Sequence, residues 1–152
     1  VPMYKHIILA YDGSASGQNA LLNIKQFAQW GKPKVTLLAV LHTPLDATSL
    51  EVGYLASAET AGFEEHLKNQ LRRGVKSLRA MGFDATGELL RGEPIREMSR
   101  YAEEKSADLI ALGHTQEKNP FKRWWSGSSA KSLVDESPCN VLIVVTHSRS
   151  TQ

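Results

Sequence analysis

Short apolar runs separated by longer stretches of helical periodicity constrain the fold of this chain more than any other feature. Residues 4–11 (YKHIILAY) and 35–41 (VTLLAVL) lack the polar–apolar alternation of a sheet with one wet face, which is typical of strands buried on both faces. Two further runs cover residues 109–112 and 140–145, whereas residues 83–90 (FDATGELL) alternate and fit a strand nearer the sheet edge. We therefore predict five strands, most of them covered on both sides.

Four stretches with apolar residues at helical spacing lie between these strands. The first begins at Ser16 and stops at Gly31-x-Pro33, and the second covers residues 57–81 after a mixed loop at 42–56. The third begins at Pro94, whose missing N–H would be unpaired at a helix start, and the fourth covers 127–136. This alternation predicts right-handed crossovers and an α/β fold of the Rossmann-like kind, an open five-stranded parallel sheet with helices on both faces.

Length and composition indicate one ordinary globular domain. The chain has 152 residues, of which 41% are hydrophobic and 22% charged, so wholesale disorder is disfavoured. We expect a single domain over residues 1–152, with a polar tail at 146–152 that frays. The net charge of +2, with no basic block longer than a dipeptide, argues against a nucleic-acid partner.

The single cysteine and the length of the apolar runs bear on where the protein works. Cys139 cannot form an intramolecular disulfide, and its apolar surroundings favour a packing role over a nucleophilic one. No apolar run approaches the ~20 residues of a membrane span, and the start lacks the apolar segment of a signal peptide. We expect a cytoplasmic protein without membrane contact.

The stretch after the fourth apolar run is the best candidate for binding a small molecule. Gly113 predicts a tight turn at the strand's end, and the loop beyond it carries Lys122 and Arg123. The loop closes on a cluster of small residues that suits a helix N-cap: Ser126, Gly127, Ser128 and Ser129. Backbone N–H groups, a helix dipole and nearby cations together favour an anion such as phosphate. An ordinary helix cap explains the same residues, and the two interpretations are compatible.

Other polar and aromatic residues near the strand ends allow two interpretations each. Asp12 follows the first strand, where its carboxylate suits Mg²⁺ and equally suits the N–H groups of a turn. His114 offers a general base or a phosphohistidine, but no Ser or Asp is placed by sequence to orient it, which favours a structural or exposed histidine. Trp124 and Trp125 fit stacking on a base, packing of the loop or an interface. The remaining histidines show no zinc-ligand spacing.

The chain resembles the universal stress protein family over nearly its whole length. The resemblance is carried, in this order, by the segments YKHIILAYDGS, VTLLAVLH, GEPIREM, ADLIALGH and GSSAKSLVDESPCNVLIVV. It implies a sheet of order 3-2-1-4-5 and a homodimer built around the last strands. In one branch of the family it also implies ATP as a ligand.

The ATP-binding branch carries Gly-x-x-Gly, nine residues and then Gly-Ser/Thr, which this chain matches in part. Gly113 takes the first position and Gly127-Ser128 the last pair, but Gln116 replaces the second glycine and ten residues lie between. The branch without nucleotide binding shows Gly-His-x-Gln, which residues 113–116 also fit. One extra loop residue costs well under ~1 kcal/mol of closure entropy. Gln116 blocks a close approach of phosphate if a positive φ is needed there, although its amide can donate a hydrogen bond.

The resemblance implies a nucleotide site whose residues come from three strand ends and one helix start. Its members are Ala10, Tyr11, Asp12, Val40, Gly113, His114, Gln116, Gly127, Ser128 and Ser129. Asp12 is the expected contact to Mg²⁺, and the main chain of Val40 the expected contact to adenine. Taken alone, Val40 also fits ordinary strand core. No residue is assigned a catalytic role.

Three functions follow from these patterns. The favoured one is binding of ATP or a related adenine nucleotide as a regulatory ligand in a stress response, with little or no hydrolysis. The alternative is a dimeric interaction module that binds no nucleotide and contacts a protein partner still unknown. An adenylating enzyme of the related nucleotide α-hydrolase group is disfavoured, because residues 12–16 (DGSAS) stand where a Ser-Gly-Gly-x-Asp pyrophosphate loop is expected.

Overall fold

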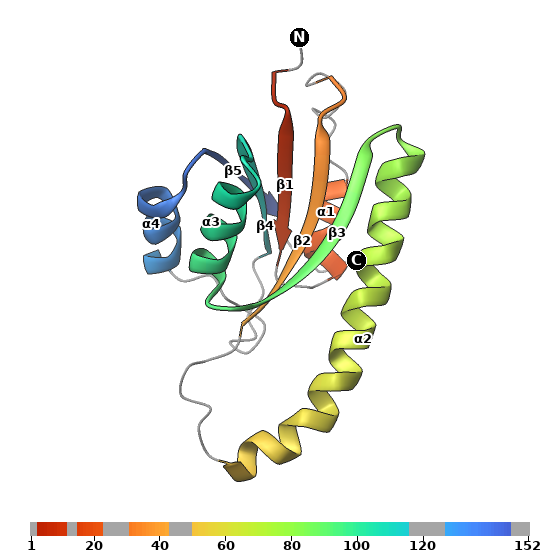
Figure 1. The fold of residues 1–152 in the computed structure, drawn as a ribbon, viewed down its shortest axis with the longest axis vertical. Coiled ribbons are helices and arrows are strands. Elements are labelled where there is room, and N and C mark those ends of the chain that lie inside the picture. The colour runs from red at the N-terminus through yellow and green to blue at the C-terminus, as the bar shows by residue number, and fades with distance from the viewer. Residues whose placement is uncertain (1–2, 12–14, 23–30, 43–49, 116–126, 147–152) are drawn as a thin grey trace, which may run out of the picture.

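Strands and helices alternate along the chain, as predicted (Figure 1). The computed structural model describes residues 3–11, 15–22, 31–42, 50–115 and 127–146, and the statements below concern these. The elements are β1 (His6–Tyr11), α1 (Ala15–Leu22), β2 (Lys34–His42), α2 (Leu50–Ala80), β3 (Asp84–Gly92), α3 (Pro94–Glu104), β4 (Leu109–Thr115), α4 (Gly127–Glu136) and β5 (Asn140–Thr146).

The strands form one parallel sheet of order β3-β2-β1-β4-β5. This confirms the predicted fold class and the strand order implied by the resemblance. Every residue of β1 is buried, because β1 lies at the centre and pairs with β2 on one side and β4 on the other. The alternating strand β3 lies at the edge, also as predicted.

Helices cover both faces of the sheet, and each face has its own apolar cluster. Successive side chains of a strand point to opposite faces, so Ile7 and Leu9 pack with residues of α1 and α2, such as Leu71. Ile8 packs on the other face with residues of α3 and α4, such as Leu133. Figure 1 shows α2 lying along β3 on one side and α3 beside α4 on the other.

Two glycines allow α2 to lie close to the sheet. A Cβ on Gly74 of α2 would lie 2.5 Å from Leu37 Cδ2, and a Cβ on Gly87 of β3 would lie 2.9 Å from Val75 Cγ2. Real Cβ atoms do not approach other atoms so closely, so a helix and a strand meet here only because both positions lack a side chain.

Two predicted element boundaries are wrong by more than two residues. Helix α2 begins at Leu50, inside the predicted loop at 42–56, because residues 50–56 (LEVGYLA) are mostly good helix formers and only Gly53 opposes them. Strand β4 runs on to Thr115 instead of turning at Gly113, because Gly113 pairs with Val144 of β5 and the ladder continues for two more residues.

None of the helices in the described segments is long and apolar enough to cross a membrane.

Candidate functional site

The carboxyl ends of β1, β2 and β4 meet at one edge of the sheet. Tyr11, the last residue of β1, lies opposite Ala39 of β2, and Ala10 lies opposite Leu112 of β4. Val40 and Gly113, the residues after Ala39 and Leu112, therefore lie at the same edge. Since β1 leads to α1 on one face and β4 leads to α4 on the other, this edge is a topological switch point, where open α/β sheets bind ligands.

Helix α4 brings its N-terminus to the segment that follows β4. The helix has ten residues, begins at Gly127 as predicted, and is anchored by fully buried Leu133 in the cluster that also contains Leu112 and Ala10. Its first turn carries no acidic side chain, so no carboxylate within that turn neutralises the positive end of the helix dipole. These features fit an anionic ligand, because main-chain N–H groups at a helix start are free to bind oxygen atoms.

Three predicted site residues are part of the core at this edge. Ala10 and Val40 are 0% and 1% exposed and belong to the cluster beneath α3 and α4. Tyr11 is 0% exposed on the other face, and its hydroxyl donates a hydrogen bond of 2.7 Å to Gln18 Oε1 of α1. Packing accounts for these side chains, so a ligand contact through them stays a prediction about their main-chain atoms.

The other predicted residues are placed only in part. His114 lies in β4 opposite Val145, and Ser128 and Ser129 lie in the first turn of α4. Several predictions fall outside the described residues: Asp12, Gln116, Lys122, Arg123, Trp124 and Trp125. The segments that are described contain no cluster of three side chains able to hold a metal ion, and the Mg²⁺ contact of Asp12 stays a prediction.

Two titratable groups with shifted pKa values, Cys139 and His6, lie away from this edge. Burial raises the pKa of the half-buried Cys139 thiol, which agrees with a packing role, although Cys139 precedes β5 instead of lying within it. His6 begins β1 at the opposite end of the strands, and burial lowers its pKa. Its Nε2 lies 2.8 Å from Thr36 Oγ1 and its Nδ1 3.4 Å from the Lys105 carbonyl, which fits a neutral ring that donates from Nδ1. His6 therefore has a structural role.

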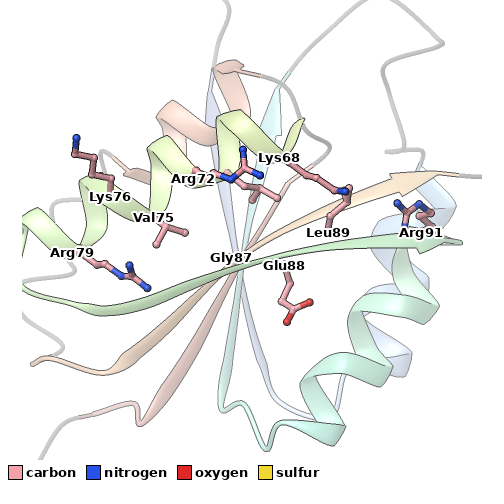
Figure 2. A pocket seen from close by; sticks show the side chains of 10 residues that line it. Lys68, Arg72, Val75, Lys76, Arg79, Gly87, Glu88, Leu89 and Arg91 are labelled. Atoms are coloured by element: carbon pink, nitrogen blue, oxygen red, sulfur yellow. The ribbon is translucent and has the colours of Figure 1, made fainter. Parts of the chain in front are cut away.

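A groove between α2 and β3 was missed by the sequence reasoning. It has a volume of about 730 Å³ and is lined on α2 by Lys68, Leu71, Arg72, Val75, Lys76 and Arg79, and on β3 by Gly87, Glu88, Leu89 and Arg91 (Figure 2). The sequence held one signal of it, namely three cationic residues of one predicted helix at intervals of four: Lys68, Arg72 and Lys76.

Comparisons with known proteins agree with the fold. The family model described as "Universal stress protein family" matches residues 3–145. A universal stress protein of Thermus aquaticus is 32% identical over 148 residues, which cover 93% of this chain and 99% of that protein. Among solved structures, a universal stress protein from Lactobacillus plantarum has a TM-score of 0.73 at 23% identity and covers 93% of this chain and 97% of its own. A universal stress protein in complex with cAMP has a TM-score of 0.59 at 21% identity, with 93% and 97% covered.

Proposed function

Because this chain belongs to the universal stress protein family, we propose that it binds an adenine nucleotide, ATP with Mg²⁺ foremost, as a regulatory ligand in a stress response. The observation that carries the proposal is the position of Gly127 and Ser128 in the first turn of α4, which follows β4 at the switch point of the sheet. A structural neighbour named as a complex with cAMP supports the same chemical class of ligand.

The described residues suit the phosphate part of such a ligand. A bound triphosphate would supply the negative charge that the N–H groups at the start of α4 favour. Gly127 presents no Cβ to a ligand, and no acidic residue of the first turn repels one. The sequence adds Lys122 and Arg123 in the preceding loop and Asp12 as the contact to Mg²⁺.

The proposed role is regulatory, with slow hydrolysis at most. Among the described residues with a shifted pKa, His6 and Cys139 lie at the other end of the strands from the proposed site, and Glu64 is bound to Arg91 of β3. We therefore assign no general acid–base pair for hydrolysis to the carboxyl edge of the sheet. Occupancy of the site would instead change which partner the protein binds in the cytoplasm.

The proposal includes a homodimer that forms through the last strand. Strand β5 is the edge strand beside β4, and its central residues Leu142 and Ile143 are 36% and 41% exposed although both are strongly apolar. Exposed apolar residues on an unpaired edge are typical of a contact between subunits.

A second function, a dimeric interaction module that binds no nucleotide, is favoured by one observation. Gly113 lies within the regular ladder of β4 and pairs with Val144, so it forms no turn that could wrap a phosphate. The sequence of residues 113–116, Gly-His-Thr-Gln, also fits the Gly-His-x-Gln pattern of the branch without nucleotide binding.

Isothermal titration calorimetry with ATP and Mg²⁺ separates the two functions. We expect saturable heat with ATP and little with GTP, because the main chain of Val40 would select the adenine ring. GTP at the same concentration controls for heat from unspecific phosphate binding. Absence of heat at millimolar ATP, together with absence of nucleotide in the supernatant of the denatured protein, would leave the interaction module as the function.

A further inference from the structure

The groove between α2 and β3 has an apolar floor and a cationic rim. Val75, Gly87 and Leu89 form the floor, and Lys68, Arg72 and Lys76 stand along the helix side of the rim (Figure 2). Glu88 is the one acidic residue of the lining, and Figure 2 shows its side chain directed to the opposite face of the sheet. There, burial raises the pKa of Tyr101, and the charge of Glu88 raises it further. The lining of the groove therefore carries more positive than negative charge.

Each end of the groove is fixed by an arginine. At one end Arg79 Nε of α2 donates a hydrogen bond of 3.0 Å to the Ala85 carbonyl of β3. At the other end Arg91 of β3 binds Glu64 of α2 through two bonds of 2.6 Å, and these bonds lower the pKa of Glu64. These contacts fix the separation of α2 and β3. The cations between the two ends are available to bind a ligand.

The cations between the two ends are exposed and weakly engaged. Arg72 contacts Asn69 on its own helix and lies 4.0 Å from Glu65, with both charged side chains more than 60% exposed. Such an exposed pair contributes little free energy in water. Lys68 and Lys76 make no ion pair with a described residue, although the charge of Lys68 helps to lower the pKa of Glu64.

The strand beside these cations has a free edge. Within the described residues β3 pairs with β2 alone, so the other side of the strand presents main-chain N–H and C=O groups to a partner, although the Ala85 carbonyl already accepts a hydrogen bond from Arg79. Its central residues Thr86, Gly87 and Glu88 are exposed. An extended peptide that added to this edge would run directly beside the row of cations on α2.

The spacing of the cations matches an extended peptide. Residues four apart on a helix rise about 6 Å along its axis, and alternate residues of a strand are about 6.6 Å apart. Acidic side chains at every second position of an added strand would therefore lie opposite Lys68, Arg72 and Lys76 in turn. Glutamate suits the site best, because its methylene groups cover the apolar floor while its carboxylate reaches the rim.

We propose that the groove between α2 and β3 binds an acidic segment of a partner protein, which adds to the free edge of β3 as a sixth strand with glutamates at alternate positions. The free edge and the apolar floor favour a peptide over a nucleic acid, since none of the residues that line the groove is an aromatic ring on which a base could stack. The proposal does not depend on whether the carboxyl edge of the sheet binds nucleotide.

The first test compares three peptides that carry the same charges. A labelled nine-residue peptide, the length of β3, with glutamate at alternate positions and threonine between is titrated with the full chain by fluorescence anisotropy. Its controls are an isomer with all glutamates adjacent and a copy N-methylated at alternate residues, which keeps the charges but cannot complete a strand ladder. We expect the alternating peptide to bind about fivefold or more tightly than either control and to lose affinity as salt rises from about 0.05 M to about 0.5 M.

The second test compares two neighbouring arginines of α2. Arg72 lines the groove, whereas Arg73 is also exposed and does not. We expect Arg72→Glu to weaken binding of the alternating peptide about tenfold and Arg73→Glu to change it less than about twofold. Both substitutions replace exposed side chains, and thermal unfolding of each variant checks that the fold is kept.

Three outcomes would overturn the proposal. Equal binding of all three peptides would mean that charge alone acts and β3 adds no strand. Tighter binding of a single-stranded oligonucleotide of equal charge, lost in Arg72→Glu, would assign the groove to nucleic acid. Absence of binding to any probe would mean that the cations serve only to prevent the β3 edges of two molecules from pairing.

Discussion

The hydroxyl of Tyr11 donates a hydrogen bond of 2.7 Å to Oε1 of Gln18, and this buried contact joins the carboxyl end of β1 to α1. Tyr11 is 0% and Gln18 7% exposed, so bulk water does not compete for this hydrogen bond. A polar pair in the core is stable only when both members are present. The contact therefore fixes α1 beside the edge where the nucleotide is proposed to bind.

Tyr11→Phe should destabilise the protein by about 1–3 kcal/mol, because Gln18 Oε1 loses this donor while it stays buried. Urea unfolding followed by circular dichroism measures the change. The double variant Tyr11→Phe, Gln18→Leu should recover part of the loss, since it removes the acceptor as well. A double variant that is less stable by the sum of both single changes would contradict this account.

Gly74→Ala should destabilise the protein by about 1–3 kcal/mol, because the new Cβ would lie 2.5 Å from Leu37 Cδ2 and 2.8 Å from Gln18 Nε2. Gly62→Ala is the matched control in the same helix. Nothing lies within 4 Å of its Cβ, so alanine should stabilise α2 by up to about 1 kcal/mol. Denaturant midpoints of the two variants should thus move in opposite directions, and a shared direction would show that α2 does not pack on the sheet as described.

The sequence predicted those parts of the fold that depend on local periodicity. The bounds of α4, Gly127–Glu136, and the edge position of β3 agree with the structure because side-chain spacing encodes both. The continuation of β4 beyond Gly113 was missed, since a glycine after an apolar run is read as a turn and the pairing with Val144 is not visible in sequence. The groove was missed for the same reason, because Arg91 and Glu64, which close it, are 27 positions apart.

The nucleotide site could be predicted only as a set of positions. The order of the strands, confirmed by the structure, brings Tyr11, Val40 and Gly113 to one edge. Whether Gln116 replaces a glycine without loss depends on the backbone of that residue, which lies outside the described segments. The spacing of a motif does not determine φ and ψ. The nucleotide site therefore stays a prediction, whereas the fold is observed.

Stability should decrease as the pH falls below the ordinary histidine pKa of 6.5, because of His6. Burial lowers its pKa in the folded state, and Lys34 and Lys105 lower it further, while the Lys105 carbonyl and Asp108 oppose them. A group with a lowered folded pKa stabilises the protein above its unfolded pKa and loses that contribution as protons bind. When Nδ1 carries the proton, neutral Nε2 accepts a hydrogen bond from the Thr36 hydroxyl, and protonation of Nε2 reverses the direction of that bond.

The free energy of unfolding, measured for wild type and His6→Gln at about pH 7.5 and about pH 5.5, isolates this contribution because the other histidines are common to both proteins. The wild type should lose more stability than the variant over this interval. An equal loss in both would show that His6 is protonated without cost in the folded state.

Ile143→Asp should convert the proposed dimer into a monomer, because a carboxylate would have to be buried between two copies of β5. Ile143 is 41% exposed in the single chain, so the substitution costs the monomer little. Sedimentation velocity measures the state of association. Met81→Asp, at a 48% exposed position after α2, is the control and should leave a dimer intact. A wild type that sediments as a monomer would remove the dimer from the proposed function.

Gly127→Asp should weaken binding of ATP about tenfold while leaving thermal stability unchanged or slightly higher. A carboxylate at the start of a helix is favourable to the helix dipole, but it competes with phosphate for the same N–H groups and repels it. Gly127 is the first residue of α4, a position where aspartate is well tolerated. Val134→Asp, at a 70% exposed position of the same helix, makes the same change of charge about 10 Å further along and should leave affinity near that of the wild type. Calorimetric titration of the three proteins would refute the phosphate position at α4 if Gly127→Asp bound ATP as tightly as Val134→Asp.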